Sequence, residues 1–301
     1  MPKAVLSGLK NHPVKISAIC AMLDSGGSAG RLRREYKILS PGDIRRSFIT
    51  LADASPAIKK LFDYRFQSGS LKGHNFANLL LAAIELSTDD YGKVIKTLNH
   101  FLNLHHQVLP VTLDKSELYA KLEKGKIIKG ETNIDIPKHN PKLKIKEVFL
   151  KPEARAYPPT LKAIENSDLI IIGPGDLYSS LAQVLLVKGI SEAIKKSKAK
   201  KVYISNLMTK NGETNNFTVL DFSKEVEKLL GGELDYVIYN GKIPSAKRLT
   251  NYKKQHSELL ELVKFDKDLN KKKFIKADIL ANSKSITHNP KKLSEVILHL
   301  E

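Results

Sequence analysis

The sequence predicts an α/β protein with a doubly wound, mainly parallel sheet. Four nearly continuous apolar runs are bounded by turn residues, as in strands of a parallel sheet that is covered on both faces. These runs span residues 14–23, 167–173, 200–208 and 234–240. Helical patterns follow the last three runs, at 179–197, 222–230 and 244–259. Strands that alternate with helices favour right-handed crossovers and therefore this architecture.

Other segments predict additions to the sheet. The chain opens on a helical pattern at residues 2–10, with no strand before it. Residues 41–104 predict several helices in succession. Residues 105–155 predict a small antiparallel β excursion, whose strand segments are QVLPVTL, KIIKGETNIDI and KIKEVFL. Because the sequence has no internal repeat and no low-complexity tail, we expect residues 1–301 to form a single domain.

Composition argues against several classes of protein. The single cysteine, Cys20, lies in an apolar run, so we expect no disulfide and no cysteine-based metal site. No apolar stretch approaches the roughly 20 residues of a membrane span. The apolar part of the N-terminus is too short for a signal peptide, so we expect a cytoplasmic protein without membrane contact.

The formal net charge of +18 raises the question of nucleic-acid binding. Most of the positive charge comes from lysines that are spread along the chain, and no nucleic-acid-binding motif is present. We therefore expect no nucleic-acid partner. A basic surface does favour phosphorylated small molecules through long-range attraction.

Glycine-rich polar loops flank the predicted strands, and ligands of open α/β sheets bind outside the carboxyl ends of the strands. We therefore expect the loops at 23–33, 40–47, 71–80 and 170–181 to converge on one cleft, and the segment at 205–214 again follows a strand end. The candidate ligand-binding residues in these loops are Asp24, Ser25, Gly26, Gly27, Ser28, Arg31, Arg33, Gly42, Asp43, Arg45, Gly73, His74, Asn78, Gly173, Gly175, Ser179, Ser180, Asn206, Thr209, Glu213 and Thr214.

The first loop, LDSGGSAGRLR, carries the strongest signal for an anion. Its glycines permit close backbone approach, and exposed N–H groups in such a loop bind anions. Arg31 and Arg33 add planar forks that suit phosphate. Asp24 is a candidate metal ligand or an acceptor for a ribose hydroxyl. A mobile loop with solvated arginines is the alternative.

The remaining loops each have a structural alternative. Asp43 is either part of the site or a simple N-cap. Arg45 falls in the first turn of the same helix, where a cation is unfavourable, and so suggests a negative partner, either phosphate or Asp24. His74 is either a phosphate contact or acid/base group, or a helix cap. Paired serines after GPG, at Ser179 and Ser180, predict phosphate binding at a helix N-terminus.

Seven motifs in fixed order resemble the gluconeogenesis-factor family, a YvcK-like branch of the CofD-like superfamily. They are LDSGGSAGRLR, SPGDIR, LFDYRF, GHNFANL, VLPVT, GPGDLYSS and NLMTKNGET. The resemblance implies a Rossmann-like fold and a cytoplasmic bacterial protein that binds a nucleotide sugar, notably UDP-N-acetylglucosamine. It implies a regulator of cell shape, envelope synthesis and growth on gluconeogenic carbon, acting through a protein partner and requiring no cofactor.

A sister branch, 2-phospho-lactate transferase, supplies the alternative function. It implies a Mg²⁺-dependent phosphoryl transfer in deazaflavin cofactor synthesis, for which Asp24 and Asp43 are the candidate catalytic residues. Leu23 stands where the family has the first of two aspartates, which weakens a Mg²⁺ site because two carboxylates hold a hard cation better than one. Asp176 replaces a family serine, and Tyr239 either contacts a base or packs in the core.

The resemblance also implies a first strand and a GGGTG-type loop before the opening helix, and this sequence has neither. We therefore expect an incomplete phosphate site and weak nucleotide binding. Strand edges left without a partner would also favour association, including a homodimer.

Overall fold

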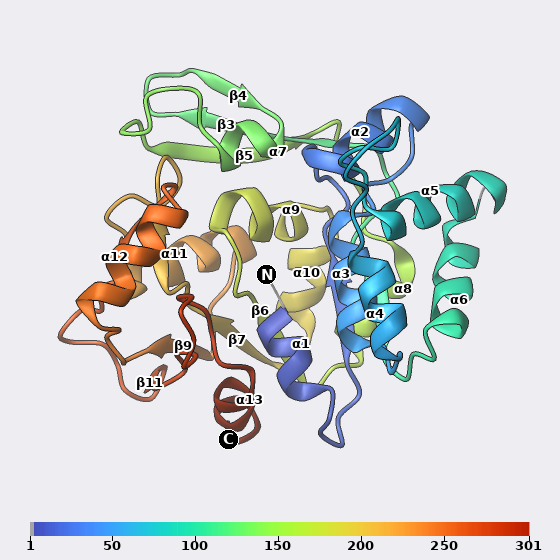
Figure 1. Ribbon diagram of the computed structural model, residues 1–301. Coiled ribbons are helices and arrows are strands. Elements are labelled where there is room, and N and C mark those ends of the chain that lie inside the picture. The colour runs from blue at the N-terminus through green and yellow to red at the C-terminus, as the bar shows by residue number, and fades with distance from the viewer. Residues whose placement is uncertain (1–2, 89, 301) are drawn as a thin grey trace.

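Two groups of parallel strands form the centre of this computed structural model, which describes residues 3–88 and 90–300 (Figure 1). The larger sheet has the order β11-β9-β7-β6, and a separate parallel pair joins β1 to β2. The strands are β1 (Ser17–Cys20), β2 (Gln107–Pro110), β6 (Leu169–Ile172), β7 (Lys200–Ile204), β9 (Tyr236–Asn240) and β11 (Phe274–Ala277). The predicted Rossmann-like α/β class is confirmed.

Helices cover both faces of the larger sheet because its strands are apolar on both sides. On β7, Val202 and Ile204 pack against α1 and α13, whereas Tyr203 packs on the opposite face among residues of α9, α10 and α11. These helices are α1 (Lys3–Leu9), α9 (Ala182–Leu185), α10 (Ile190–Lys196), α11 (Val219–Leu230) and α13 (Pro290–Leu298). The opening helix was expected from residue 2, which lies outside the described residues.

The helices of segment 41–104 pack on β1 and β2 and form a hydrophobic cluster of their own with them. They are α3 (Gly42–Leu51), α4 (Pro56–Asp63), α5 (Phe76–Thr88) and α6 (Tyr91–Phe101), and they follow α2 (Gly27–Tyr36). α8 (Pro158–Glu165) leads into β6.

The antiparallel sheet, seen at the top of Figure 1, is smaller than expected. It has the order β4-β3-β5, from β3 (Glu117–Leu122), β4 (Ile127–Lys129) and β5 (Ile145–Lys151). The segment QVLPVTL does not belong to it, because β2 pairs in parallel with β1. The second half of KIIKGETNIDI is not β structure either: it forms the short helix α7 (Glu131–Asp135).

The predicted helix at 179–197 is wrong as a single element. A turn of π-helix, η1 (Leu177–Leu181), leads into α9, and Gly189 at φ +99° then begins α10. A side chain is disfavoured at such a φ, so the chain changes direction at this glycine. The antiparallel pair of β8 (Met208–Lys210) and β10 (Leu259–Leu262) was not predicted from the sequence. In chain order β8 comes before α11, and β10 comes after α12 (Ala246–Gln255).

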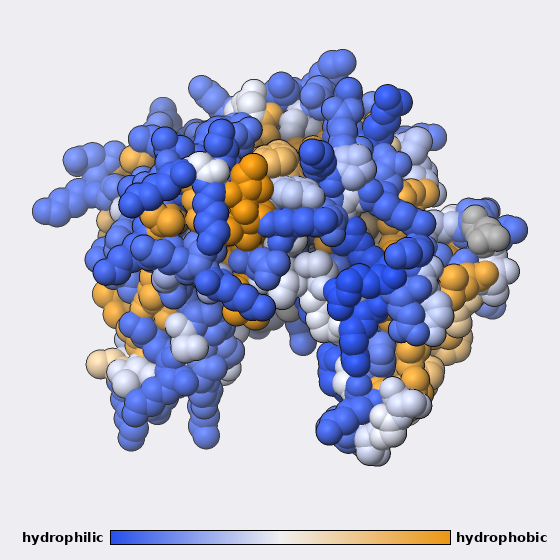
Figure 2. All heavy atoms as spheres, turned by 90° about the horizontal axis from the view of Figure 1, so that it is seen from above, coloured by the Kyte–Doolittle hydropathy of each residue, from blue (hydrophilic) through white to orange (hydrophobic). Residues whose placement is uncertain are grey.

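The sheet is interrupted between β1 and β6. Among the described residues, β1 pairs only with β2, and β6 pairs only with β7. A cavity of 1360 Å³ lies between the two strands. Figure 2 shows one face of the molecule, which is mostly hydrophilic and hollowed between two lobes. No helix in the described ranges is long and apolar enough to cross a membrane.

Candidate functional site

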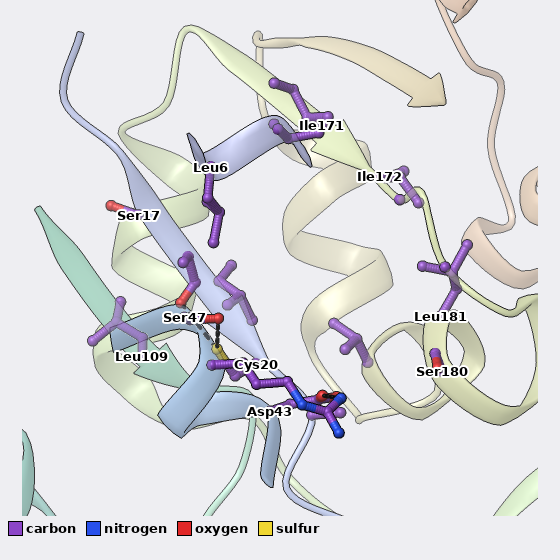
Figure 3. A pocket seen from close by; sticks show the side chains of 18 of the residues that line it. Leu6, Ser17, Cys20, Asp43, Ser47, Leu109, Ile171, Ile172, Ser180 and Leu181 are labelled. Carbon is purple, nitrogen blue, oxygen red and sulfur yellow. Dashed lines mark hydrogen bonds and ion pairs between the residues drawn. The ribbon is translucent and has the colours of Figure 1, made fainter. Parts of the chain in front are cut away.

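One end of the cavity lies at the carboxyl ends of β1 and β6, where the sequence predicts a ligand site. Glycine loops follow both strands and face the cavity there. The predicted residues that line it are Asp24, Gly26, Gly27, Ser28, Gly42, Asp43, Arg45, Asn78, Gly173, Gly175 and Ser180. In Figure 3, Asp43 and Ser180 approach the cavity from opposite sides.

The other predicted residues do not line this cavity. They are Ser25, Arg31, Arg33, Gly73, His74, Ser179, Asn206, Thr209, Glu213, Thr214 and Tyr239. The cavity is therefore lined by the loops after β1 and β6 and by the start of α3. The other predicted residues do not face it.

Two helices begin at the cavity without a side-chain cap. α2 starts after Gly26 and α3 after Pro41, and neither residue makes a capping hydrogen bond through its side chain. The first N–H groups of a helix lack partners within the helix, and the helix dipole adds positive potential there. Both helix starts can therefore hold an anion.

A carboxylate already accepts a hydrogen bond from the first glycine loop. Ser25 donates its backbone N–H to Glu131 Oε2 over 3.3 Å, and the Ser25 hydroxyl lies 3.0 Å from Thr132 Oγ1. Both partners come from α7, so the short helix in the β excursion fixes this loop. Close packing of α2 on this loop also requires Gly30 in the first turn of the helix, because a Cβ there would lie 2.0 Å from the Ser25 carbonyl oxygen.

Asp24 and Glu131 both line the cavity and lie close enough for their charges to interact. Burial and the charge of Asp24 raise the pKa of Glu131 to about 7. Burial and the charge of Asp43 raise the pKa of Asp24. Near neutral pH the pair therefore holds a proton or attracts a cation. Leu23 stands where the family has a second carboxylate, and Glu131 brings a carboxylate near Asp24 from another part of the chain. The two carboxylates could hold Mg²⁺, which prefers oxygen ligands.

Asp43 is not the N-cap of α3. Pro41 occupies that position, and Asp43 lies in the first turn, where its carboxylate pairs with Arg46 over 3.1 Å. Arg45 does not pair with Asp24. Its guanidinium donates to the Phe62 carbonyl over 3.2 Å and to Asp63 Oδ1 over 3.3 Å.

The other predicted phosphate forks also serve the fold. Arg33 donates to the carbonyls of Leu23 and Ser116, which ties α2 to the start of β3. Arg31 donates to the Lys72 carbonyl over 3.1 Å. The arginine-rich window thus holds neighbouring loops in place, and acidic side chains dominate the cavity mouth.

His74 is a buried structural residue. Its Nδ1 lies 3.2 Å from the Ser28 hydroxyl, and the same hydroxyl accepts from the backbone of Asn75 and from Asn78 Nδ2. Burial lowers the pKa of His74, which favours the neutral ring. This network holds the α2 start, and Asn78 leaves a buried Oδ1 without a partner beside the cavity.

The predicted phosphate position at the 179–180 serines is filled by a carboxylate. Glu213 accepts the backbone N–H groups of Tyr178 and Ser179 over 3.2 and 3.1 Å, and the Ser179 hydroxyl over 2.8 Å. Its side chain is fully buried. Ser179 and Glu213 therefore stabilise η1, and only Ser180 faces the cavity.

Lys210 occupies the centre of the carboxylate group behind η1. Carboxylate oxygens of Asp135, Asp176 and Glu213 lie within 4.8 Å of one another, a spacing that a metal ion could use. Lys210 Nζ is paired with all three, at 2.9 Å from Asp176 and 3.1 Å from Glu213. Burial opposes the ammonium charge, but the carboxylates outweigh it and raise the pKa of Lys210. An ammonium, not a metal ion, neutralises this group.

The remaining candidates are part of the framework. Asn206 donates to the Gly175 carbonyl and accepts from Tyr203, so it fixes the loop after β6. Thr209 bonds to Glu261 in β10, and Thr214 accepts the Lys210 backbone N–H. Tyr239 packs on Phe265 with ring centroids 5.5 Å apart, in agreement with its core alternative.

Sequence reasoning missed several lining residues: Arg46, Arg65, Glu131, Thr132 and Asp135. Glu131 was missed because its segment was assigned to a strand. The available signal was Gly130, which suits a turn at φ +89°, followed by an acidic residue typical of a first helical turn.

Comparisons with known proteins show which family this chain resembles over most of its length. The family model described as 2-phospho-L-lactate transferase CofD matches residues 3–280. The gluconeogenesis factor of Halalkalibacterium halodurans is 39% identical over 303 residues, covering 98% of this chain and 91% of that protein. The gluconeogenesis factor of Bacillus subtilis is 43% identical over 239 residues, covering 78% and 74%. A crystal structure of a UPF0052-family protein from Bacillus halodurans has a TM-score of 0.91 at 38% identity, covering 99% of this chain and 96% of that chain.

Proposed function

Because the chain belongs to the gluconeogenesis-factor branch of the CofD family, we propose that it binds a nucleotide sugar of the UDP-N-acetylglucosamine type and acts as a regulator. The regulated processes are cell shape, envelope synthesis and growth on gluconeogenic carbon, through a protein partner. No cofactor is required in this proposal.

One observation carries the proposal. Two helix N-termini without side-chain caps, those of α2 and α3, open on the same cavity at the carboxyl end of the sheet. A diphosphate bears two negatively charged groups, and each helix start suits one of them. The glycines after β6 leave room for the sugar or the base on the other side of the cavity.

Among the described residues that line the mouth of the cavity, we find no pair that forms an activated nucleophile. The hydroxyl of Ser28 is engaged by His74 and Asn78, and the ring of His74 is buried behind α2 rather than exposed to the cavity. Binding without turnover is therefore the simpler use of the site. The proposal places the protein in the cytoplasm, which is supported by its one cysteine, a buried free thiol.

A thermal-shift series tests the proposal. UDP-sugars, dinucleotides and guanosine nucleotides are added at high concentration, each with and without Mg²⁺. Ligands that bind only the folded state raise Tm. We expect stabilisation by UDP-sugars without metal, and no stabilisation by any of them would contradict the proposal.

A matched pair of glycine variants locates the site. Gly42→Ala puts a Cβ 2.5 Å from Asp24 Oδ2 at the cavity mouth, and Gly92→Ala puts one 3.0 Å from Asp90 Oδ1 at the start of α6, away from the cavity. We expect the first variant to lose the ligand-induced shift and the second to keep it. In a strain that lacks its own family member, only the second should restore growth on gluconeogenic carbon.

The second candidate function is a Mg²⁺-dependent phosphoryl transfer of the 2-phospho-lactate transferase type. The Asp24–Glu131 pair favours it, since two carboxylates can hold a cation beside a phosphate. Stabilisation by a guanosine nucleotide only when Mg²⁺ is present, with loss of that effect in Asp24→Asn, would support it over the first candidate.

A further inference from the structure

The small sheet β4-β3-β5 has one face on the hydrophobic core and an outer face that points away from it. On β3, Leu118, Ala120 and Leu122 are buried in the core. Successive side chains of a strand point to opposite faces, and residues that lie opposite each other share a face. The outer face therefore consists of Glu117, Tyr119, Lys121, Ile127, Lys129, Glu147, Phe149 and Lys151.

Apolar side chains from all three strands gather on this outer face. Tyr119 lies opposite Phe149, and the two rings stack with centroids 5.4 Å apart. Ile127 lies opposite Lys121 and is 55% exposed. Figure 2, which looks down on the small sheet, shows apolar atoms among hydrophilic ones. An apolar group with a polar surround is typical of a surface that binds another molecule.

The polar surround of this group is positively charged. Lys121 and Lys129 lie beside Tyr119 on the outer face, and Lys151 lies at the end of β5. Residues 115–151 contain five acidic residues and ten lysines, and all ten lysines are exposed: Lys115, Lys121, Lys124, Lys126, Lys129, Lys138, Lys142, Lys144, Lys146 and Lys151.

Part of the acidic charge in this segment is turned away from the outer face. Glu131 and Asp135 belong to α7 and line the cavity, where Asp135 pairs with Lys210. The outer face and its border therefore carry an excess of positive charge, which is complementary to an acidic partner.

The geometry of the two rings favours an acidic protein over a nucleic acid. The rings are nearly parallel, at 10°, so each covers one face of the other. Lys129 Nζ lies over the Tyr119 ring, 5.9 Å from its centroid, and also pairs with Glu117 over 2.7 Å. Nucleic-acid bases stack on open ring faces. A stacked pair instead presents ring edges, whose positive potential favours carboxylates.

The outer face is joined directly to the candidate functional site. β4 ends at Lys129, and α7 begins two residues later at Glu131. Between them, Gly130 donates its N–H to the Leu118 carbonyl of β3 over 2.8 Å. Glu131 lines the cavity and accepts from the Ser25 backbone. A molecule on the outer face is therefore close in the chain to a group that holds the first glycine loop.

We propose that the outer face of the sheet β4-β3-β5 is a docking surface for an acidic protein segment. The segment places several carboxylates against the lysines and one aromatic or apolar side chain against Tyr119, Phe149 and Ile127. This inference rests on the proposed function, since it assigns a place to the protein partner. The surface lies outside the ligand cavity, so its test needs no nucleotide.

A synthetic peptide tests the proposal on the whole chain. The probe has one central tryptophan between two runs of about three glutamates each. Because the protein has no tryptophan, the probe is the only source of tryptophan emission. We expect a blue shift of that emission, a Kd of about 100 μM or tighter, and weaker binding as salt is raised. A control peptide with glutamine in place of glutamate should bind at least about tenfold more weakly.

Matched charge reversals locate the surface. Lys121→Glu with Lys151→Glu changes the outer face, and Lys198→Glu with Lys271→Glu makes the same change in net charge at exposed lysines elsewhere. We expect the first pair to weaken binding of the acidic peptide about tenfold or more, and the second pair less than about threefold. Lys121→Gln with Lys151→Gln is the milder variant if the first pair does not fold, and it should also weaken binding.

The outcomes separate this inference from the proposed function. No binding of the acidic peptide, equal losses in the two charge-reversed proteins, or tighter binding of oligothymidylate or of anionic lipid vesicles at this surface would overturn the assignment. The expected pattern in a protein whose Tm does not respond to UDP-sugars would support the docking surface and contradict only the proposed nucleotide-sugar binding.

Discussion

At the residue scale, two glutamates accept hydrogen bonds from backbone N–H groups of the glycine loops, in the way that a phosphate would. Glu131 accepts from the backbone of Ser25, and Glu213 accepts from Tyr178 and Ser179. A carboxylate oxygen and a phosphate oxygen both accept hydrogen bonds from N–H groups, and the acceptors of these three N–H groups are side chains of the protein itself. A single sequence does not show whether such a loop binds a carboxylate of the protein itself or a phosphate of a ligand.

Replacing Glu131 by glutamine is expected to change how stability depends on pH. The pKa of Glu131 in the folded protein is about 7, above its ordinary value of 4.5, so the folded state binds more protons between those pH values. Its contribution to stability is complete below about pH 4.5 and is lost as pH rises through 7. After screening of this half-buried group the loss is about 1–2 kcal/mol.

The measurement is Tm of both proteins from about pH 5 to 8. Glu131→Gln keeps an acceptor for the Ser25 N–H but does not titrate. The Tm of the variant relative to the original protein should therefore increase with pH. A constant difference would mean that Glu131 titrates near its ordinary pKa.

Glu213 gives a second residue-scale prediction. Glu213→Ala leaves two backbone donors and part of the Lys210 charge uncompensated in the interior, which should cost about 3–5 kcal/mol of unfolding free energy. Glu213→Gln keeps acceptors for the donors, and Lys210 keeps Asp135 and Asp176, so its cost should be about 1–2 kcal/mol. Urea midpoints measure both, and equal losses would contradict the anion role of Glu213.

At the scale of elements, the sequence predicts whether a segment is a strand or a helix where its apolar pattern is long. It does not predict where each strand or helix begins and ends. The runs around β6, β7 and β9 are apolar on both faces, and the structure has parallel strands there. β8 and β10 are short, and their half-polar residues pair only because the chain brings them together. Gly189 breaks the predicted helix at 179–197, since local sequence does not reveal that its φ is positive.

The first turn of α2 contains two glycines that are needed for different reasons. A Cβ on Gly30 would lie 2.0 Å from a backbone oxygen, whereas Gly27 has φ +51° with open space around it. Gly30→Ala should destabilise the protein by about 3 kcal/mol or more, and Gly27→Ala by about 1 kcal/mol. Chemical unfolding of the two variants checks this, and similar small losses would show that the loop moves aside.

At the scale of the whole molecule, charge acts against compactness. The formal net charge is +18, and the lysines that carry it are mostly on the surface. Raising NaCl from about 50 to 500 mM screens their repulsion, so we expect Tm to rise by about 2–5 °C. Differential scanning fluorimetry measures it, and a falling Tm would indicate that surface ion pairs outweigh the repulsion.

The candidate site was only partly predictable from the sequence. Strand-end loops placed Asp24, Gly42 and Gly173 around one cavity, as the architecture requires. Glu131 could not be assigned to it, because more than 100 residues of chain separate Glu131 from Asp24 and only the position of α7 over the loop brings them together.

The interrupted sheet has a consequence for the heat absorbed on unfolding. The strands β1 and β2 with α3–α6 share a hydrophobic cluster that outside them includes Leu6 of α1, and no backbone ladder among the described residues joins them to β6. Cooperativity is carried by shared packing and pairing, so these two blocks are only loosely coupled. The calorimetric enthalpy of the whole chain then exceeds the van't Hoff enthalpy of its first transition.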